Sequence, residues 1–81
     1  MERNKLTERQ QEVYDYIVRY TQEHLYSPSI TDICVGCNIK SRSDVWRYLR
    51  TLENKGYVRL SQHQEARSIR LIGFKLVRVE E

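Results

Sequence analysis

The first third of the chain carries apolar residues at the spacing of an amphipathic helix. They recur at intervals of three and four residues, at Val13, Tyr14, Ile17, Val18, Tyr20 and Leu25. Thr7 and Gln10 stand three residues apart, which is the spacing of a capping box that satisfies backbone N–H groups at a helix start. The pattern therefore predicts a helix that starts near Thr7 and ends around His24.

A second, short helix is predicted after Pro28. Proline disfavours a helical backbone at Ser27, and Ser29 with Asp32 then repeats the spacing of a helix start. Asn38 tolerates the left-handed conformation that closes a helix, so we expect this helix to end there. It would direct three side chains inward: Ile33, Cys34 and Cys37.

Ser41 and Asp44 give a third helix start shortly afterwards. The apolar stripe of this helix consists of Val45, Leu49 and Leu52. Gly56 follows, where the end of a helix favours positive φ, so the predicted helix spans about Arg42 to Lys55. Two helices joined by a turn of a few residues, the second of them basic, are typical of a helix-turn-helix.

After the third helix the hydrophobic period changes to two. Apolar and polar residues alternate over residues 57–60 and again over residues 68–71, which predicts two strands. The polar residues 61–66 between them predict a β-hairpin with a polar tip. Residues 74–79 give another short extended segment.

The chain is short enough to form only one domain. Its 81 residues, 40% of them apolar, can bury a modest core but leave little room for a deep catalytic cavity. The elements predict an α+β fold, a small winged helix-turn-helix over residues 1–72, with a C-terminal extension at residues 73–81. No apolar run approaches the ~18–20 residues needed to cross a membrane, and the N-terminus has no signal-peptide core, so we expect a cytoplasmic protein.

Positive charge is concentrated in the middle of the chain. The formal net charge is only +3, but residues 40–70 hold 8 basic and 3 acidic side chains, whereas residues 1–39 hold 4 basic and 6 acidic ones. A basic segment that includes a helix-turn-helix helix and a hairpin is typical of a nucleic-acid-binding face.

The third predicted helix presents hydrogen-bond donors opposite its apolar stripe. At about 100° per residue, with Val45 at zero, these side chains fall between about 140° and 200°. They are Ser43, Arg47, Arg50 and Asn54. Arginine binds the major-groove edge of guanine or a phosphate, asparagine pairs with adenine, and serine serves either role. This face indicates DNA binding, and the alternative is a solvated charged face.

Trp46 falls near 100° on the same helical wheel, at the boundary between the core and the outer face. It either packs against the first helix or the wing, or it contacts a thymine methyl group or a sugar. Packing is favoured, because tryptophan is usually largely buried.

The predicted hairpin carries polar and basic residues suited to a DNA-contacting wing. They are Arg59, Gln62, His63, Gln64, Arg67 and Arg70. Such a wing lies along a phosphate backbone or reaches into the minor groove. The alternative is a hairpin that is polar only because it is exposed.

Cys34 and Cys37 have the C-x-x-C spacing used in redox and zinc sites. A structural zinc site needs four ligands, and only His24 and His63 remain to complete it. We therefore expect both cysteines to pack as small core residues, and we expect no metal and no cofactor. No catalytic motif or glycine-rich phosphate loop is present in the sequence, so an enzyme is not expected.

Several segments in combination resemble the N-terminal DNA-binding domain of LexA-type SOS repressors. The resemblance covers about residues 5–72 and is carried by Lys5–Val13, Ser27–Ile30, Lys40–Val45, Leu52–Val58 and Ala66–Leu71. It implies a winged helix-turn-helix that binds double-stranded operator DNA, usually as a dimer on a palindrome, with its third helix in the major groove.

The resemblance also implies which residues contact DNA. The start of the third helix places Ser41, Ser43, Asp44, Trp46 and Arg47 at the bases, and the wing falls at residues 61–66. Arg42, at the same helix start, is also expected to contact DNA. Trp46 and Arg47 stand where relatives commonly carry smaller or acidic side chains, and Asn38 replaces the usual glycine at the turn. We therefore expect an operator different from the common ones of the family.

LexA-type repressors continue into a self-cleaving domain with a Ser-Lys dyad and an Ala-Gly scissile bond. This sequence has no serine after Ser68 and no Ala-Gly pair, so we expect that it cannot cleave itself. It is then either a free-standing repressor that occludes a promoter or the DNA-binding fragment of a longer repressor. Residues 73–81 form either a dimerisation strand or a third edge strand on the hairpin. Two alternatives of other classes are a protein-interaction module and a thiol or metal sensor at Cys34 and Cys37.

Overall fold

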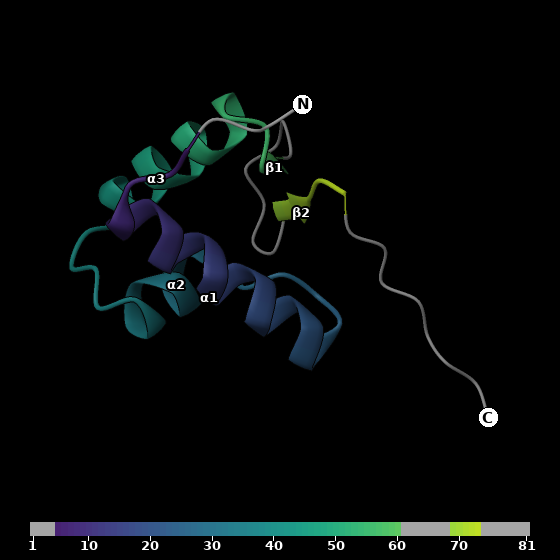
Figure 1. The fold of residues 1–81 in the computed structure, drawn as a ribbon. Coiled ribbons are helices and arrows are strands. Elements are labelled where there is room, and N and C mark those ends of the chain that lie inside the picture. The colour runs from purple at the N-terminus through teal and green to yellow at the C-terminus, as the bar shows by residue number, and fades with distance from the viewer. Residues whose placement is uncertain (1–4, 61–68, 74–81) are drawn as a thin grey trace.

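Three helices are followed by a two-stranded antiparallel hairpin (Figure 1). The computed structural model describes residues 5–60 and 69–73, so the predicted hairpin tip and the extended segment at residues 74–79 lie outside the described residues. The elements are α1 (Glu8–His24), α2 (Ile30–Gly36), α3 (Arg42–Asn54), β1 (Val58–Leu60) and β2 (Ile69–Leu71). The α+β fold expected from the sequence is confirmed.

The first two helices begin with the capping boxes that the sequence predicts. Thr7 Oγ1 accepts a hydrogen bond from the backbone N–H of Gln10, and Gln10 Oε1 accepts one from the backbone N–H of Thr7. Ser29 and Asp32 exchange the same pair of hydrogen bonds at the start of α2. Each box satisfies N–H groups that have no partner within the helix.

The end of α2 differs from the expectation by two residues. The helix ends at Gly36, and Asn38 adopts the expected left-handed conformation, with φ 55°. The backbone N–H of Ile39 donates to Cys34 O at 2.9 Å. This is a Schellman motif, in which the left-handed residue stands two positions beyond the last helical residue. The prediction is therefore right about the conformation of Asn38 and wrong about the length of the helix.

The expected place of Leu25 on the buried stripe of α1 is wrong. The helix ends at His24, and Leu25 takes a left-handed conformation, with φ 64°, so that its side chain leaves the stripe. That side chain is 56% exposed. Val13, Tyr14 and Ile17 are buried in the core and Val18 packs against it, as expected. Tyr20 is partly buried and packs against the rings of Tyr16, His24 and Tyr26.

The core lies between the three helices and the inner face of the hairpin. Val58 on β1 and Ile69 on β2 are buried against the helices. Arg59 and Arg70, which stand opposite each other on the two strands, are exposed on the other face of the hairpin. The rings of Tyr14 and Tyr57 pack in a T-shaped arrangement, with centroids 5.0 Å apart. The largest side chains with almost no exposure are Val13, Ile17, Ile33, Val45, Leu49, Leu52 and Val58. Within the described residues, no helix is long and apolar enough to span a membrane.

Candidate nucleic-acid interface

The outer face of α3 is exposed to solvent along its whole length. Val45, Leu49 and Leu52 anchor the inner side of the helix in the core with 0% exposure. The opposite side chains are all exposed, and they are Ser43, Arg47, Arg50 and Asn54, with Arg42 at the first turn. A rigidly anchored helix therefore presents a row of hydrogen-bond donors outward.

The first turn of α3 brings an acidic residue beside the first arginine of this face. Ser41 caps the helix, with its Oγ accepting from the backbone N–H of Ser43 at 3.2 Å. The Asp44 carboxylate lies 3.7 Å from the Arg47 guanidinium, and the Arg47 side chain is 80% exposed. An ion pair this long and this exposed holds the arginine weakly, so its donors remain available.

The two flanks of α3 are attached to different parts of the fold. Trp46 and Glu53 are seven residues apart and therefore lie on the same flank, two turns apart. Trp46 is half-buried and packs against the core, in line with the favoured packing interpretation. Glu53 Oε2 accepts a hydrogen bond from the backbone N–H of Leu60 at 3.0 Å. This bond ties the outgoing end of β1 to the helix that carries the exposed donors.

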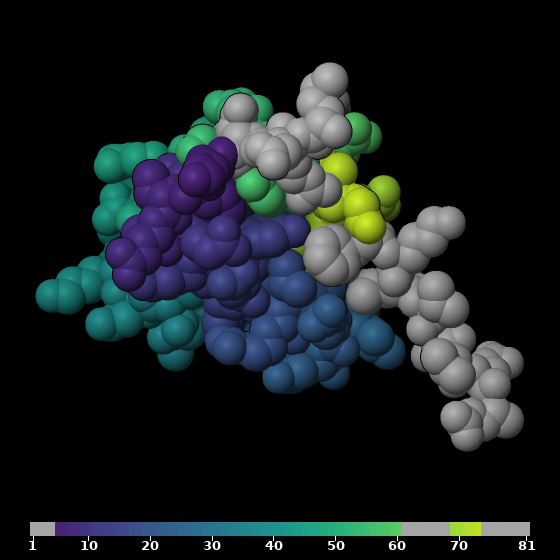
Figure 2. All heavy atoms as spheres, viewed as in Figure 1, coloured from purple at the N-terminus to yellow at the C-terminus, as the bar shows by residue number. Residues whose placement is uncertain are grey.

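The other flank of α3 is fastened to the start of α1. Lys55 Nζ donates to the backbone carbonyl of Lys5 at 2.8 Å and to Gln10 Oε1 at 3.0 Å. Figure 2 shows the first turn of α1, in purple, beside the green residues at the end of α3. Gln10 Oε1 thus serves both the α1 capping box and the link to α3.

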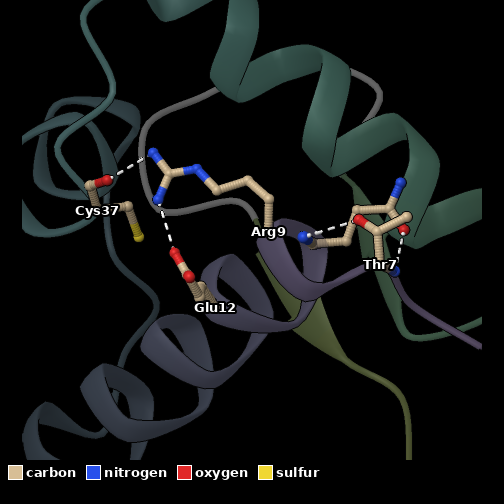
Figure 3. Close-up of polar contacts among 5 residues, drawn as sticks. Thr7, Arg9, Glu12 and Cys37 are labelled. Atoms are coloured by element: carbon tan, nitrogen blue, oxygen red, sulfur yellow. Dashed lines mark hydrogen bonds and ion pairs between the residues drawn. The ribbon is translucent and has the colours of Figure 1, made fainter.

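Arg9 connects α1 to the turn between α2 and α3 (Figure 3). Its guanidinium donates through Nη2 to the carbonyl of Cys37 at 2.7 Å and through Nη1 to Glu12 Oε2 at 2.8 Å. The hydrogen bond to Glu12 is the largest cause that raises the pKa of Arg9. The charged guanidinium holds the turn of the helix-turn-helix from one side.

The same turn packs tightly against α1 at Gly36. A Cβ atom on this residue would overlap the ring of Tyr16, whose hydroxyl donates to the carbonyl of Asp32 at 3.1 Å. Only glycine allows α2 to approach α1 this closely without a shift of that ring. Gly36 therefore fixes the distance between the two helices that support α3.

Cys34 and Cys37 are both free thiols that pack against the core, as expected. Cys37 is 8% exposed, and burial raises the pKa of its thiol, which keeps it protonated at neutral pH. Among the residues that the structure describes, no three His, Cys, Asp or Glu side chains gather in a way that could hold a metal ion.

Comparison with known proteins identifies the family. The family model described as the LexA DNA binding domain matches residues 3–68. The chain belongs to the LexA DNA-binding domain family. It is 42% identical over 67 residues to the LexA repressor of Herpetosiphon aurantiacus, an overlap that covers 83% of this chain and 31% of that protein. It is 39% identical over 79 residues to the LexA repressor of Staphylococcus epidermidis, covering 95% of this chain and 38% of that protein. The chain thus spans about a third of the length of these relatives.

In this LexA-type domain, the predicted DNA-contacting residues of α3 fall into two groups. The first group is exposed and consists of the outer-face residues together with Arg42, namely Arg42, Ser43, Arg47, Arg50 and Asn54. The second group is half-buried at the border of that face and consists of Ser41, Asp44 and Trp46. Gln62, His63, Gln64 and Arg67, predicted for the wing, lie outside the described residues. Their contribution to DNA binding stays a prediction.

Residues that orient the LexA-type α3 do not stand out in the sequence. Arg9, Glu53 and Lys55 act on backbone atoms or side chains in other elements. Arg9 and its partner carbonyl are 28 positions apart, and Lys55 and Lys5 are 50 apart. Helical periodicity reports only which face a residue occupies, so it carries no signal for such contacts.

Proposed function

We propose that this domain binds double-stranded DNA sequence-specifically, with α3 in the major groove. The observation that carries the proposal is the exposed row of Ser43, Arg47, Arg50 and Asn54 on a helix whose inner side is fully buried, in a chain of the LexA DNA-binding family. A major groove admits one α-helix, and base edges there display a distinct pattern for each base pair.

The chemistry of this face suits particular base edges. Arg47 and Arg50 each offer a planar fork of donors that matches O6 and N7 of guanine, and Asn54 matches N6 and N7 of adenine. Asp44, beside Arg47, is an acceptor for the amino group of cytosine. Ser41, Arg42 and Trp46 border the face and act on the sugar-phosphate backbone or on thymine methyl groups.

Residues 1–72 form the DNA-binding unit in this proposal, and the wing adds backbone or minor-groove contacts through Gln62, His63, Gln64 and Arg67. Residues 73–81 add a dimerisation strand, for which their apolar positions Phe74, Leu76, Val77 and Val79 are suited. A dimer would read a palindromic operator, because two-fold symmetry in the protein matches two-fold symmetry in the DNA.

The regulatory outcome proposed is repression by occlusion of a promoter. It is supported by the names of the relatives, which are LexA repressors. A domain bound across promoter DNA blocks access to that DNA by its bulk alone, so repression needs no chemistry beyond binding. Because the chain spans about a third of those proteins, repression by this chain is a proposal in its own right.

The test is selection of binding sites from a random-sequence DNA pool with the purified 81-residue protein, at two salt concentrations. We expect enrichment of a palindrome, with affinity that falls steeply as salt rises. Enrichment of a single half-site would contradict the dimer, and no enrichment at low salt would contradict DNA recognition and favour a protein-interaction module.

Arg47→Ala separates base reading from general attraction. We expect it to weaken binding to the selected site by about 1–3 kcal/mol and to relax the preference at one base position. Arg67→Ala should instead weaken binding to all sequences alike, and Arg19→Ala on α1 serves as the control for loss of one exposed positive charge. Unchanged binding by Arg47→Ala would remove α3 as the reading element.

A further inference from the structure

Two arginines face each other across the hairpin. In the antiparallel register, Arg59 on β1 pairs with Arg70 on β2, and both side chains are exposed. The neighbouring pairs, Val58 with Leu71 and Leu60 with Ile69, turn to the core side. Directly opposite residues in such a pair have Cβ atoms roughly 4.5–5.5 Å apart, so the two arginine side chains leave the hairpin from one small area of its outer face.

Neither arginine is neutralised within residues 5–60 and 69–73. The ion pairs in this part of the chain join Arg9 to Glu12 and Arg47 to Asp44. Like charges directly opposite each other destabilise a β-pair, whereas an opposite charge at either position would stabilise it. The fold therefore carries a repulsion here that an anion between the two side chains would relieve.

The backbone that carries the pair is fixed on both sides. The N–H of Leu60 is held by the Glu53 carboxylate of α3, and the N–H of Ile72 donates to the carbonyl of Tyr57 at 3.1 Å. Val58, next to Arg59, is fully buried. The two arginines thus project from a hairpin base that is attached directly to the helix with the exposed donors.

We propose that Arg59 and Arg70 form a phosphodiester clamp that fixes the hairpin on the DNA backbone. This proposal rests on the proposed function and adds a contact to it. A guanidinium group donates two parallel hydrogen bonds to the oxygens of a phosphate. Two such groups on one face therefore supply more donors than one phosphate can accept. The pair also belongs to the segment with a clear positive excess, residues 40–70, which includes α3.

The decisive variant is Arg59→Glu, because folding and binding should respond in opposite directions. Glutamate opposite Arg70 replaces a repulsion with an attraction, so the thermal midpoint of unfolding should rise. The same change removes one arm of the clamp and adds a charge that repels phosphate. Affinity for a labelled random-sequence duplex should therefore fall by roughly tenfold or more at low salt. Arg70→Glu should behave in the same way, and Arg59→Lys should retain most of the affinity.

Arg19→Glu is the matched control, since it makes the same charge change at an exposed position on α1. The slope of log affinity against log salt gives a second readout. In the hairpin variants it should become shallower by about 0.9 for each phosphate that the protein no longer neutralises, and it should change less in the control. Hairpin variants that bind DNA as the control does would overturn the clamp and leave the proposed function standing. A wild-type protein that binds no duplex would overturn both.

Discussion

Leu25 adopts a backbone conformation that is unfavourable for a leucine. With φ 64° and ψ 20°, it ends α1 in the left-handed region, and its N–H donates to the carbonyl of Thr21 at 2.8 Å. This region costs an L-residue roughly 1–2 kcal/mol, because Cβ approaches a carbonyl oxygen. The side chain is 56% exposed, so burial offsets little of that cost.

Replacing Leu25 by glycine should therefore stabilise the domain. We expect a gain of about 1 kcal/mol in the free energy of unfolding, since relief of the left-handed strain exceeds the extra entropy that glycine gives the unfolded chain. Urea denaturation followed by circular dichroism measures the change.

Leu25→Ala is the control for this substitution. Alanine also removes the exposed side chain but keeps Cβ, so it should not reproduce the gain made by glycine. Equal stability of the glycine and alanine variants would show that backbone strain at residue 25 is not the cause.

At the scale of elements, the contact between the end of α3 and the start of α1 depends on one lysine. Lys55→Met keeps most of the aliphatic stem but removes the donors to Lys5 O and Gln10 Oε1. The expected loss is about 1 kcal/mol in the free energy of unfolding, the usual net value of a hydrogen bond. Amide hydrogen exchange should also become faster at Gln10, in the first turn of α1.

Lys40→Met provides the matched control for charge, because Lys40 is exposed and its side chain makes no hydrogen bond or ion pair with any residue in the described part of the chain. We expect this variant to unfold at nearly the wild-type urea concentration. A similar loss of stability in both lysine variants would mean that net charge is responsible, and that the link from Lys55 to α1 contributes nothing.

Most helix and strand boundaries could be predicted because the signals are local. Capping at Thr7 and Ser29 involves residues three positions apart, and positive φ at Gly56 follows from the helix end beside it. The conformation that ends α1 is harder to predict, because a leucine occupies a position where glycine or asparagine is typical. The role of Gly36 needs the tertiary structure, since it lies in the close approach to Tyr16.

The candidate site, too, has features that follow from the sequence and features that need the tertiary structure. The exposed row on α3 follows from helical periodicity once the apolar stripe is known, and the structure places each of its side chains outward. The pairing of Arg59 with Arg70 required the register of the hairpin, which depends on how β1 and β2 align. Sequence alternation assigns each arginine to the outer face but does not say which residue stands opposite.

For the molecule as a whole, two weak acids link stability to alkaline pH. Burial raises the pKa of the Cys37 thiol, and burial followed by the Asp32 charge raises the pKa of Tyr16. The unfolded chain releases these protons at lower pH than the folded chain does. Between the pKa values of the unfolded and folded states, the unfolded chain therefore binds fewer protons. Below about pH 8.5, these two groups should leave the free energy of unfolding unchanged. As pH rises further, they should lower it.

The measurement is urea denaturation between neutral pH and about pH 10, for the wild type and Cys37→Ala. The variant loses stability at neutral pH because it leaves a small gap in the core. Its free energy of unfolding should nevertheless decline less steeply with pH, since the thiol no longer contributes. Parallel curves for the two proteins would contradict a linkage through Cys37.

The bond between Lys55 and the carbonyl of Lys5 also bears on how the protein is made. A chain that is still being synthesised contains α1 and α2 well before α3, yet Lys5 and Gln10, at the start of α1, meet Lys55 only after the whole of α3 has been made. Long-range closure of this kind delays folding relative to local helix formation. A nascent chain should therefore complete its core only after Lys55 has left the ribosome, and an arrested shorter chain should remain sensitive to protease.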